Sequence, residues 1–176
     1  KTATNSDGNT IKITGNATAK NSSQQFIFLE AGGNIGVNVV NVDAAPGQNA
    51  GGINIRANTA KGGGQNSPTF MVGSAGQANG VQSLSAVNAV TQFGGGFVYV
   101  RNGGKGGIQL LSPSAISISV AQGRNGALYL DSRHGNITLP AGKLSLDGQN
   151  GNGAGSIIIN ANKIITNNSE ISVDDV

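Results

Sequence analysis

Apolar and polar residues alternate in short runs along this chain, which is the pattern of half-buried β-strands. Typical runs read apolar-polar-apolar, as in Ile116-Ser117-Ile118 and Leu144-Ser145-Leu146. The sustained apolar spacing at three and four residues that an amphipathic helix needs is missing from every window. The pattern therefore predicts an all-β protein.

In the second half of the chain these runs come in sets of three that recur about every thirty residues. Corresponding runs are offset by 30, 29 and 28 residues between the first two sets, and by 29, 27 and 27 residues between the second and third. A three-residue strand cannot hold a fold alone, but strands stacked on their equivalents in the next repeat share a continuous core. The nine runs are Phe97–Val100, Ile108–Leu110, Ile116–Ile118, Leu128–Leu130, Ile137–Leu139, Leu144–Leu146, Ile157–Ile159, Ile164–Thr166 and Ile171–Val173.

The first half fits the same scheme with longer spacings. Its alignment places Asn54 between Lys12 and Tyr99, at offsets of 42 and 45 residues. The extra length falls in loops rich in Gly, Asn and Gln, and loops tolerate insertions because closure entropy grows slowly with length. The first predicted set is Ile11–Ile13, Phe26–Phe28 and Val37–Val39, and the second is Ile53–Ile55, Phe70–Val72 and a strand near Leu84 or, equally, over 89–93.

These repeats predict a parallel β-helix, or β-solenoid, of about five coils with three short strands each. We expect one domain over residues 1–176, with longer, looser coils in 1–94 and regular coils of about 27–30 residues in 95–176. Asn102-Gly103 and Asn125-Gly126 suit the sharp corners, because Gly and Asn adopt positive φ at low cost. A β-sandwich with Asn-Gly hairpins is the alternative, and the constant three-strand step favours the solenoid.

Composition narrows the class of protein. The 29 glycines and the 11% of charged residues suggest disorder, but the regular β-branched runs argue against it. There are no cysteines, which excludes disulfides and thiolate metal sites. The net charge of +3 is spread thinly along the chain, whereas nucleic-acid binders concentrate charge in a patch, so we expect no nucleic-acid partner. No apolar run approaches the roughly 20 residues of a membrane span.

Two segments, 47–58 and 148–162, resemble each other closely. Each is a Gly-rich corner feeding an alternating strand, Ile53-Asn54-Ile55-Arg56-Ala57-Asn58 in the first and Ile157-Ile158-Ile159-Asn160-Ala161-Asn162 in the second. This motif is similar to the repeats of filamentous-haemagglutinin-type exoproteins of two-partner secretion, over residues 47 to 176. The resemblance implies a right-handed, secreted β-helix at a bacterial surface that holds an adhesive element away from the cell. The secretion domain of that family is not evident, which implies a shaft segment or a separate solenoid protein.

Catalytic chemistry finds little support in the chain. Asp131, Arg133 and His134 form the single mixed ionisable cluster, but glycan-cleaving enzymes need a pair of carboxylates, and the pattern favours a solvated corner. Gly62-Gly63-Gly64 and Gly94-Gly95-Gly96 lack the aspartates of calcium-binding nonapeptide repeats. We therefore expect no enzyme, no catalytic residue, no metal and no cofactor.

Alternation assigns the middle residue of each run to the outside. One outward column reads Asn38, Ser85, Ser117, Ser145 and Ser172, and it is interpreted as a flat polar face. Another reads Lys12, Asn54, Tyr99, Tyr129 and Ile158. We expect Tyr99 to stack on Tyr129 of the adjacent coil. The pair forms either a stabilising ladder or, with Ile158 and Ile165 of the last coil, a contact surface.

The sequence thus favours a structural or adhesive extracellular β-solenoid, as the shaft of a surface adhesin or the subunit of a filament. A polysaccharide-active β-helix enzyme and an ice- or surface-binding module are the alternatives. Because solenoid ends expose unpaired backbone and core side chains, the expected partners are further repeats or further copies of the chain, stacked end to end. Glycans or a cell surface are the other expected partners.

Overall fold

The computed structural model describes residues 2–5, 11–13, 17–18, 26–44, 50–61, 64–87, 96–118, 126–147 and 155–174, and of the first three ranges the backbone alone. Fifteen β-strands and two 3-10 helices, Thr59–Lys61 and Pro113–Ala115, make up this part of the chain. Every strand pairing within it is parallel. The prediction of an all-β protein with parallel strands is confirmed.

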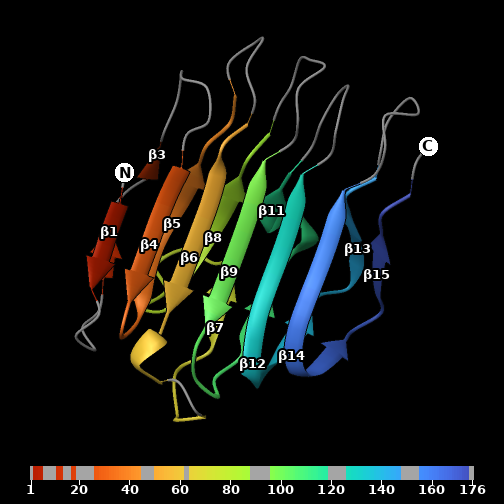
Figure 1. Cartoon of the computed structure of the whole chain (residues 1–176). Helices are drawn as coiled ribbons and strands as arrows, with labels where there is room; N and C mark the ends of the chain where they lie inside the picture. The colour runs from red at the N-terminus through yellow and green to blue at the C-terminus, as the bar shows by residue number, and fades with distance from the viewer. Residues whose placement is uncertain are drawn as a thin grey trace.

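One row of strands, which we call the front sheet, faces the viewer in Figure 1. Neighbouring strands in this row come from successive passes of the chain. The row consists of β1 (Thr2–Asn5), β4 (Phe26–Ala31), β6 (Gly52–Ala57), β9 (Phe97–Asn102), and the first parts of β12 (Ala127–Leu139) and β14 (Ser156–Thr166).

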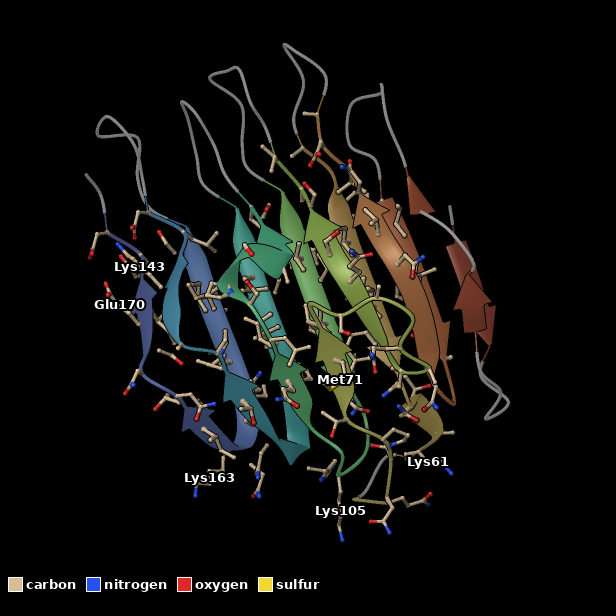
Figure 2. The ribbon with its side chains drawn as sticks, turned by 180° about the vertical axis from the view of Figure 1, so that it is seen from behind. Lys61, Met71, Lys105, Lys143, Lys163 and Glu170 are labelled. Carbon is tan, nitrogen blue, oxygen red and sulfur yellow. The ribbon has the colours of Figure 1, made fainter. Side chains whose placement is uncertain are left out.

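The remaining strands lie behind the front sheet, and Figure 2 shows them with Met71 near the middle. The first group is β2 (Ile11–Ile13), the start of β5 (Ile35–Asn41), the start of β8 (Gly80–Ser85), β7 (Phe70–Val72), β10 (Ile108–Leu110) and the second parts of β12 and β14. The second group is β3 (Ala17–Thr18), the ends of β5 and β8, β11 (Ile116–Ser117), β13 (Gly142–Ser145) and β15 (Ser169–Ser172). Among the strands that the structure describes, β13 and β15 pair only with each other.

The chain returns to the front sheet on every pass. Along one row of paired residues the order is Thr2, Phe28, Asn54, Tyr99, Tyr129 and Ile158. We call one such pass a coil. Parallel strands curled round a common interior are consistent with a parallel β-helix.

The core consists of inward columns that run from coil to coil. Ile27, Ile53, Val98 and Leu128 are paired in succession and are fully buried. Nearly all of the buried apolar side chains between Ile27 and Leu146 form a single cluster. Since burying one Ile or Leu side chain is worth roughly 1.5–3 kcal/mol, these columns supply the stability that three-residue strands lack.

Residues 64–79 form an insertion that the repeat pattern does not reveal. The strands β7 and β8 follow each other in the chain and yet lie side by side in parallel, with Met71 paired to Gly80. Buried Asn79 holds the insertion in place: its Nδ2 donates to the Pro68 and Thr69 carbonyl oxygens, and its Oδ1 accepts from the Ile35 N–H at 3.2 Å. These bonds tie the backbone of Pro68 and Thr69 in the insertion to the start of β5.

Most of the pairings predicted for the regular coils are confirmed. Tyr99 pairs with Tyr129, Gln109 with Thr138, and Ser145 with Ser172. In the looser part, Asn54 pairs with Tyr99 and Ser85 with Ser117. The strand near Leu84 is therefore β8, while the alternative at 89–93 lies outside the described residues.

The predicted position of Lys12 is wrong. Lys12 pairs with Gly36 behind the front sheet, and the residue beside Asn54 is Phe28. The set that joined Ile11–Ile13 with Phe26–Phe28 and Val37–Val39 therefore mixes two coils. Alternation identifies the strands but not which strands pair, because all three strands of the predicted set share one apolar-polar-apolar pattern.

Candidate contact surface

Five of the seven aromatic residues of the chain lie at outward positions of the front sheet. Phe70 is buried in the core, and Phe93 lies outside the described residues. Pairing places these five side chains in two adjacent columns. We call the surface that they form the aromatic face: Phe26, Phe28, Phe97, Tyr99 and Tyr129.

Three of these rings form a connected cluster on β9 and β12. The Phe97 and Tyr99 rings are stacked nearly parallel, with an interplanar angle of 9° and centroids 6.4 Å apart. Tyr129 is tilted against both, with centroids 5.2 Å from Phe97 and 6.3 Å from Tyr99. Tilted and offset pairs at these separations are favourable, so the cluster confirms the predicted proximity of Tyr99 and Tyr129.

Phe26 extends the aromatic face across β6, where Gly52 leaves room for its ring. A Cβ atom at position 52 would lie 2.3 Å from Cε1 of Phe26. Phe26 is 60% exposed, which is unusual for a phenylalanine and indicates a surface available for contact. The absent side chain at Gly52 therefore allows an exposed ring to lie on the sheet.

Within the aromatic face, Arg56 on β6 links the Phe28 ring on β4 to the Tyr99 ring on β9. Its guanidinium carbon lies 5.3 Å from the ring centroid of Phe28 and 5.6 Å from that of Tyr99, which are cation–π distances. The guanidinium also pairs with Glu30 at 3.4 Å and donates to Asn54 Oδ1 at 3.2 Å. These contacts orient the charge while leaving the side chain 38% exposed.

Asp131 anchors the edge of the aromatic face. The Tyr99 hydroxyl donates to Asp131 Oδ2 at 2.9 Å, and Arg133 Nε lies 3.3 Å from Asp131 Oδ1. Burial, together with the hydrogen bond to Asp131, raises the pKa of Tyr99 above its ordinary value. The Asp131 side chain is only 4% exposed, and Arg101 Nε lies 3.9 Å from its Oδ2. By accepting the hydrogen bond from the Tyr99 hydroxyl, this buried carboxylate fixes Tyr99 at the edge of the aromatic face.

The structure brings together three of the four residues predicted as a contact surface. Ile158 pairs with Tyr129 and is 39% exposed, so it continues the aromatic column. Ile165 pairs with Thr138, on the part of β14 that lies behind the front sheet. The prediction missed Phe26, Phe28, Phe97 and Arg56. The signal for Phe26 and Phe28 was the offset of 26 residues from Phe28 to Asn54, and the longer spacing predicted for the first coils concealed it.

The predicted ladder of small polar side chains is corrected at one end. Asn41 pairs with Ser85, whereas Asn38 lies three positions earlier in the strand. Two of its hydroxyls are also bound by aspartate side chains. Ser85 Oγ donates to Asp43, and Ser172 Oγ donates to Asp147.

These two aspartates make the same set of bonds, which we call the aspartate staple. Each lies two residues after the end of a strand and accepts from the hydroxyl of the next coil. Each also accepts a backbone N–H two residues beyond that hydroxyl: Val87 donates to Asp43 at 2.8 Å and Asp174 to Asp147 at 3.0 Å. Bonds to a carboxylate are stronger than neutral ones, so the staple links successive coils at their corners.

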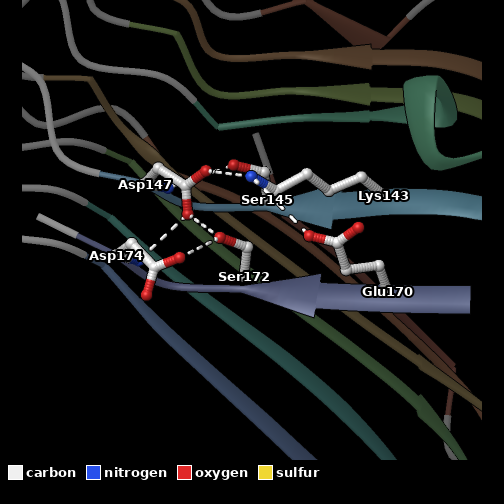
Figure 3. A network of polar contacts seen from close by, with 6 residues as sticks. All are labelled: Lys143, Ser145, Asp147, Glu170, Ser172 and Asp174. Carbon is white, nitrogen blue, oxygen red and sulfur yellow. Dashed lines mark hydrogen bonds and ion pairs between the residues drawn. The ribbon is translucent and has the colours of Figure 1, made fainter. Parts of the chain in front are cut away.

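Figure 3 shows the second staple with its charges. Lys143 Nζ lies 2.8 Å from Asp147 Oδ2 and 3.9 Å from Glu170 Oε1. Hydrogen bonds from Lys143, Ser145 and Ser172 hold the pKa of Asp147 well below its ordinary value of 3.8. Asp147 is therefore ionised at neutral pH and stabilises the pairing of β13 with β15.

The cluster considered for catalysis is split. Asp131 and Arg133 form an ion pair, while His134 is exposed. Among the residues that the structure describes, no group of three His, Cys, Asp or Glu side chains could hold a metal ion. Within the same residues, no helix is long and apolar enough to span a bilayer.

Comparison of the chain with models of protein families, with curated proteins and with solved structures gave no match.

Proposed function

We propose that this chain is a structural and adhesive segment of a secreted bacterial surface protein, and that its aromatic face binds glycans. In this proposal the fold is a parallel β-solenoid with the right-handed coiling that the resemblance to haemagglutinin-type exoproteins implies. The strand directions support that hand: in Figure 1 the front strands point down as the chain advances from left to right, and the rear strands return upward.

The aromatic face is the observation that carries the glycan proposal. Sugar rings present apolar C–H faces that pack against aromatic side chains, and hydroxyls that need polar partners at the edge. Phe26, Tyr99 and Tyr129 supply the rings. Arg56 and Arg101, with side chains 38% and 40% exposed, supply donors beside them.

The arrangement favours binding over cleavage. Hydrolysis needs two carboxyl groups facing the scissile bond, one of them able to donate a proton. Asp131 is buried under Tyr99, Arg101 and Arg133, and Glu30 is paired with Arg56. A polysaccharide held on this face would therefore be retained intact.

Affinity electrophoresis in gels containing a neutral glucan, a galactomannan or hyaluronan tests this function. We expect at least one polysaccharide to retard the chain, and Tyr129→Ala to weaken that retardation about tenfold, which corresponds to about 1.4 kcal/mol. Gln109→Ala, an outward change behind the front sheet, is the matched control and should bind normally.

Two results would contradict the proposal. The first is equal mobility in every gel. The second is retardation that Tyr129→Ala leaves unchanged. Circular dichroism at the same temperature shows whether Tyr129→Ala keeps its β-structure, and Tyr129→Phe, which retains the ring, should bind nearly as well as the wild type.

A further inference from the structure

The fold gathers basic side chains at one corner of the coils. This corner joins the end of each front strand to the rear strand that follows it, and Figure 2 shows Lys61, Lys105 and Lys163 along it, away from Lys143. Of the Lys and Arg side chains that the structure describes, all except Lys143 lie at this corner. We call them the basic ridge: Arg56, Lys61, Arg101, Lys105, Arg133 and Lys163.

The basic ridge has an excess of positive charge. The acidic side chains described at the same corner, Glu30 and Asp131, are paired with its three arginines. No described acidic side chain lies within ion-pair distance of Lys61, Lys105 or Lys163. Six positive and two negative charges therefore leave a net +4 there.

The opposite side of the coils carries the other sign. Over the second group of rear strands and the corner that follows them, the described charges are one positive and four negative, a net −3. The charge that is spread thinly along the sequence is therefore separated by the fold into a basic and an acidic side. The five residues of the acidic side are Asp43, Lys143, Asp147, Glu170 and Asp174.

The basic ridge adjoins the aromatic face. Arg56 follows Asn54 by two residues on β6, and Arg101 follows Tyr99 by two residues on β9, so each arginine is the next outward side chain along its strand. Arg56 and Arg101 are paired neighbours. One continuous surface thus presents aromatic rings and then cations, and a ligand that covers both needs flat apolar faces together with negative groups.

The spacing of the lysines indicates how densely such a ligand is charged. Lys61 and Lys105 belong to successive coils, those of β6 and β9, and Lys163 belongs to the coil of β14, two coils further. Coils repeat about every 4.8 Å, whereas each strand of a nucleic acid carries a charge about every 3.4 Å. A polysaccharide in which acidic sugars alternate with neutral ones has the sparser charge that these lysines match.

We propose that the aromatic face and the basic ridge together bind an acidic polysaccharide, one in which sugars with carboxylates alternate with neutral sugars. The rings pack against the sugar faces, and the ammonium and guanidinium groups donate charge-assisted hydrogen bonds to the carboxylates. This inference rests on the proposed binding of glycans by the aromatic face and narrows the glycan to an acidic class.

Hyaluronan and carboxyl-reduced hyaluronan test the acidic class directly, because the second polymer keeps the sugar backbone and replaces each carboxylate with an alcohol. In affinity electrophoresis of the full chain, we expect hyaluronan to retard the protein at about a tenfold lower concentration than the reduced polymer does. At 1 M salt, where the Debye length is about 3 Å, this difference should disappear.

Variants of the lysines locate the binding on the ridge. We expect the triple variant Lys61→Gln, Lys105→Gln and Lys163→Gln to bind hyaluronan about tenfold more weakly, since each exposed charge contributes modestly, and to bind the reduced polymer as the wild type does. Lys105→Gln alone should weaken hyaluronan binding about threefold. Lys143→Gln, which removes the same charge on the acidic side, is the matched control and should bind normally.

Two outcomes would overturn this inference. In the first, hyaluronan and its reduced form bind equally; if Tyr129→Ala weakens both, glycan binding by the aromatic face stands and the acidic class falls. In the second, an oligothymidylate with the same number of charges binds more tightly than hyaluronan and the lysine variants weaken that binding, which identifies a nucleic-acid partner. Absence of retardation by every polysaccharide would instead contradict the proposed function itself.

Discussion

At the scale of single residues, close approach of coils depends on glycines whose missing Cβ leaves room for backbone. Gly107 has φ of +78°, and a Cβ at this position would lie 2.2 Å from the carbonyl oxygen of Asn136 in the next coil. Gly76 also has positive φ, +69°, but no atom lies within 4 Å of a Cβ built there. Alanine substitutions at these two glycines therefore separate the cost of backbone strain from the cost of a steric clash between coils.

We expect Gly107→Ala to lower the free energy of unfolding by roughly 2–4 kcal/mol, because strain and overpacking add. Gly76→Ala should cost only about 1 kcal/mol, the price of positive φ in a residue with a Cβ. Urea denaturation followed by circular dichroism measures both. Equal losses in the two variants would mean that the coils do not approach as closely at Gly107 as the structure has them.

At the scale of elements, the pairing of β13 with β15 depends on the charge of Asp147. Its pKa is lowered in the folded chain by bonds from Lys143, Ser145 and Ser172, and returns to about 3.9 on unfolding. The unfolded chain therefore binds a proton more readily than the folded one. The stabilisation is fully present above about pH 5 and is lost as the pH falls below about 4.

We expect Asp147→Asn to melt at a lower temperature than the wild type at pH 6, and this gap to narrow steadily between pH 4 and pH 2. Thermal melts across that range measure it. Glu170→Gln is the control, because its carboxylate is 68% exposed and 3.9 Å from Lys143, where ion pairs contribute little. A gap of constant size at every pH would show that Asp147 acts through its shape rather than its charge.

The sequence predicted where the strands lie more reliably than which strands pair with each other. Alternation located the Tyr99 and Tyr129 strands, and the near-constant repeat gave their pairing correctly. The repeat gave the wrong partner for Lys12 because an insertion before Gly80 lengthens one coil to 45 residues, and a similar length was predicted for the coil before it, which is only 26 residues long. The bonds of Asn79 that hold this insertion join residues far apart in sequence, and periodicity carries no information about them.

The contact surface was predicted only in part, because the spacing predicted for the first coils was too long. Tyr99, Tyr129 and Ile158 were found because they lie in the regular coils. Phe26 and Phe28 join them through the shorter first coils, and Arg56 joins through its cation–π contacts. The aspartate staple was missed because it joins a corner residue of one coil to a strand residue of the next, a relation that a search within single runs does not reveal.

At the scale of the whole molecule, one inward column shows how the stability that an isoleucine contributes depends on its burial. Ile137 and Ile164 are paired neighbours in that column, and they differ in what covers them. Ile137 is fully buried, while Ile164 is 45% exposed. Removing the same atoms from each therefore reports burial alone.

We expect Ile137→Ala to lower the free energy of unfolding by roughly 2–5 kcal/mol, and Ile164→Ala by about 1 kcal/mol in dilute solution. Urea denaturation followed by circular dichroism measures both costs, and equal losses in the two variants would show that Ile164 is covered as fully as Ile137.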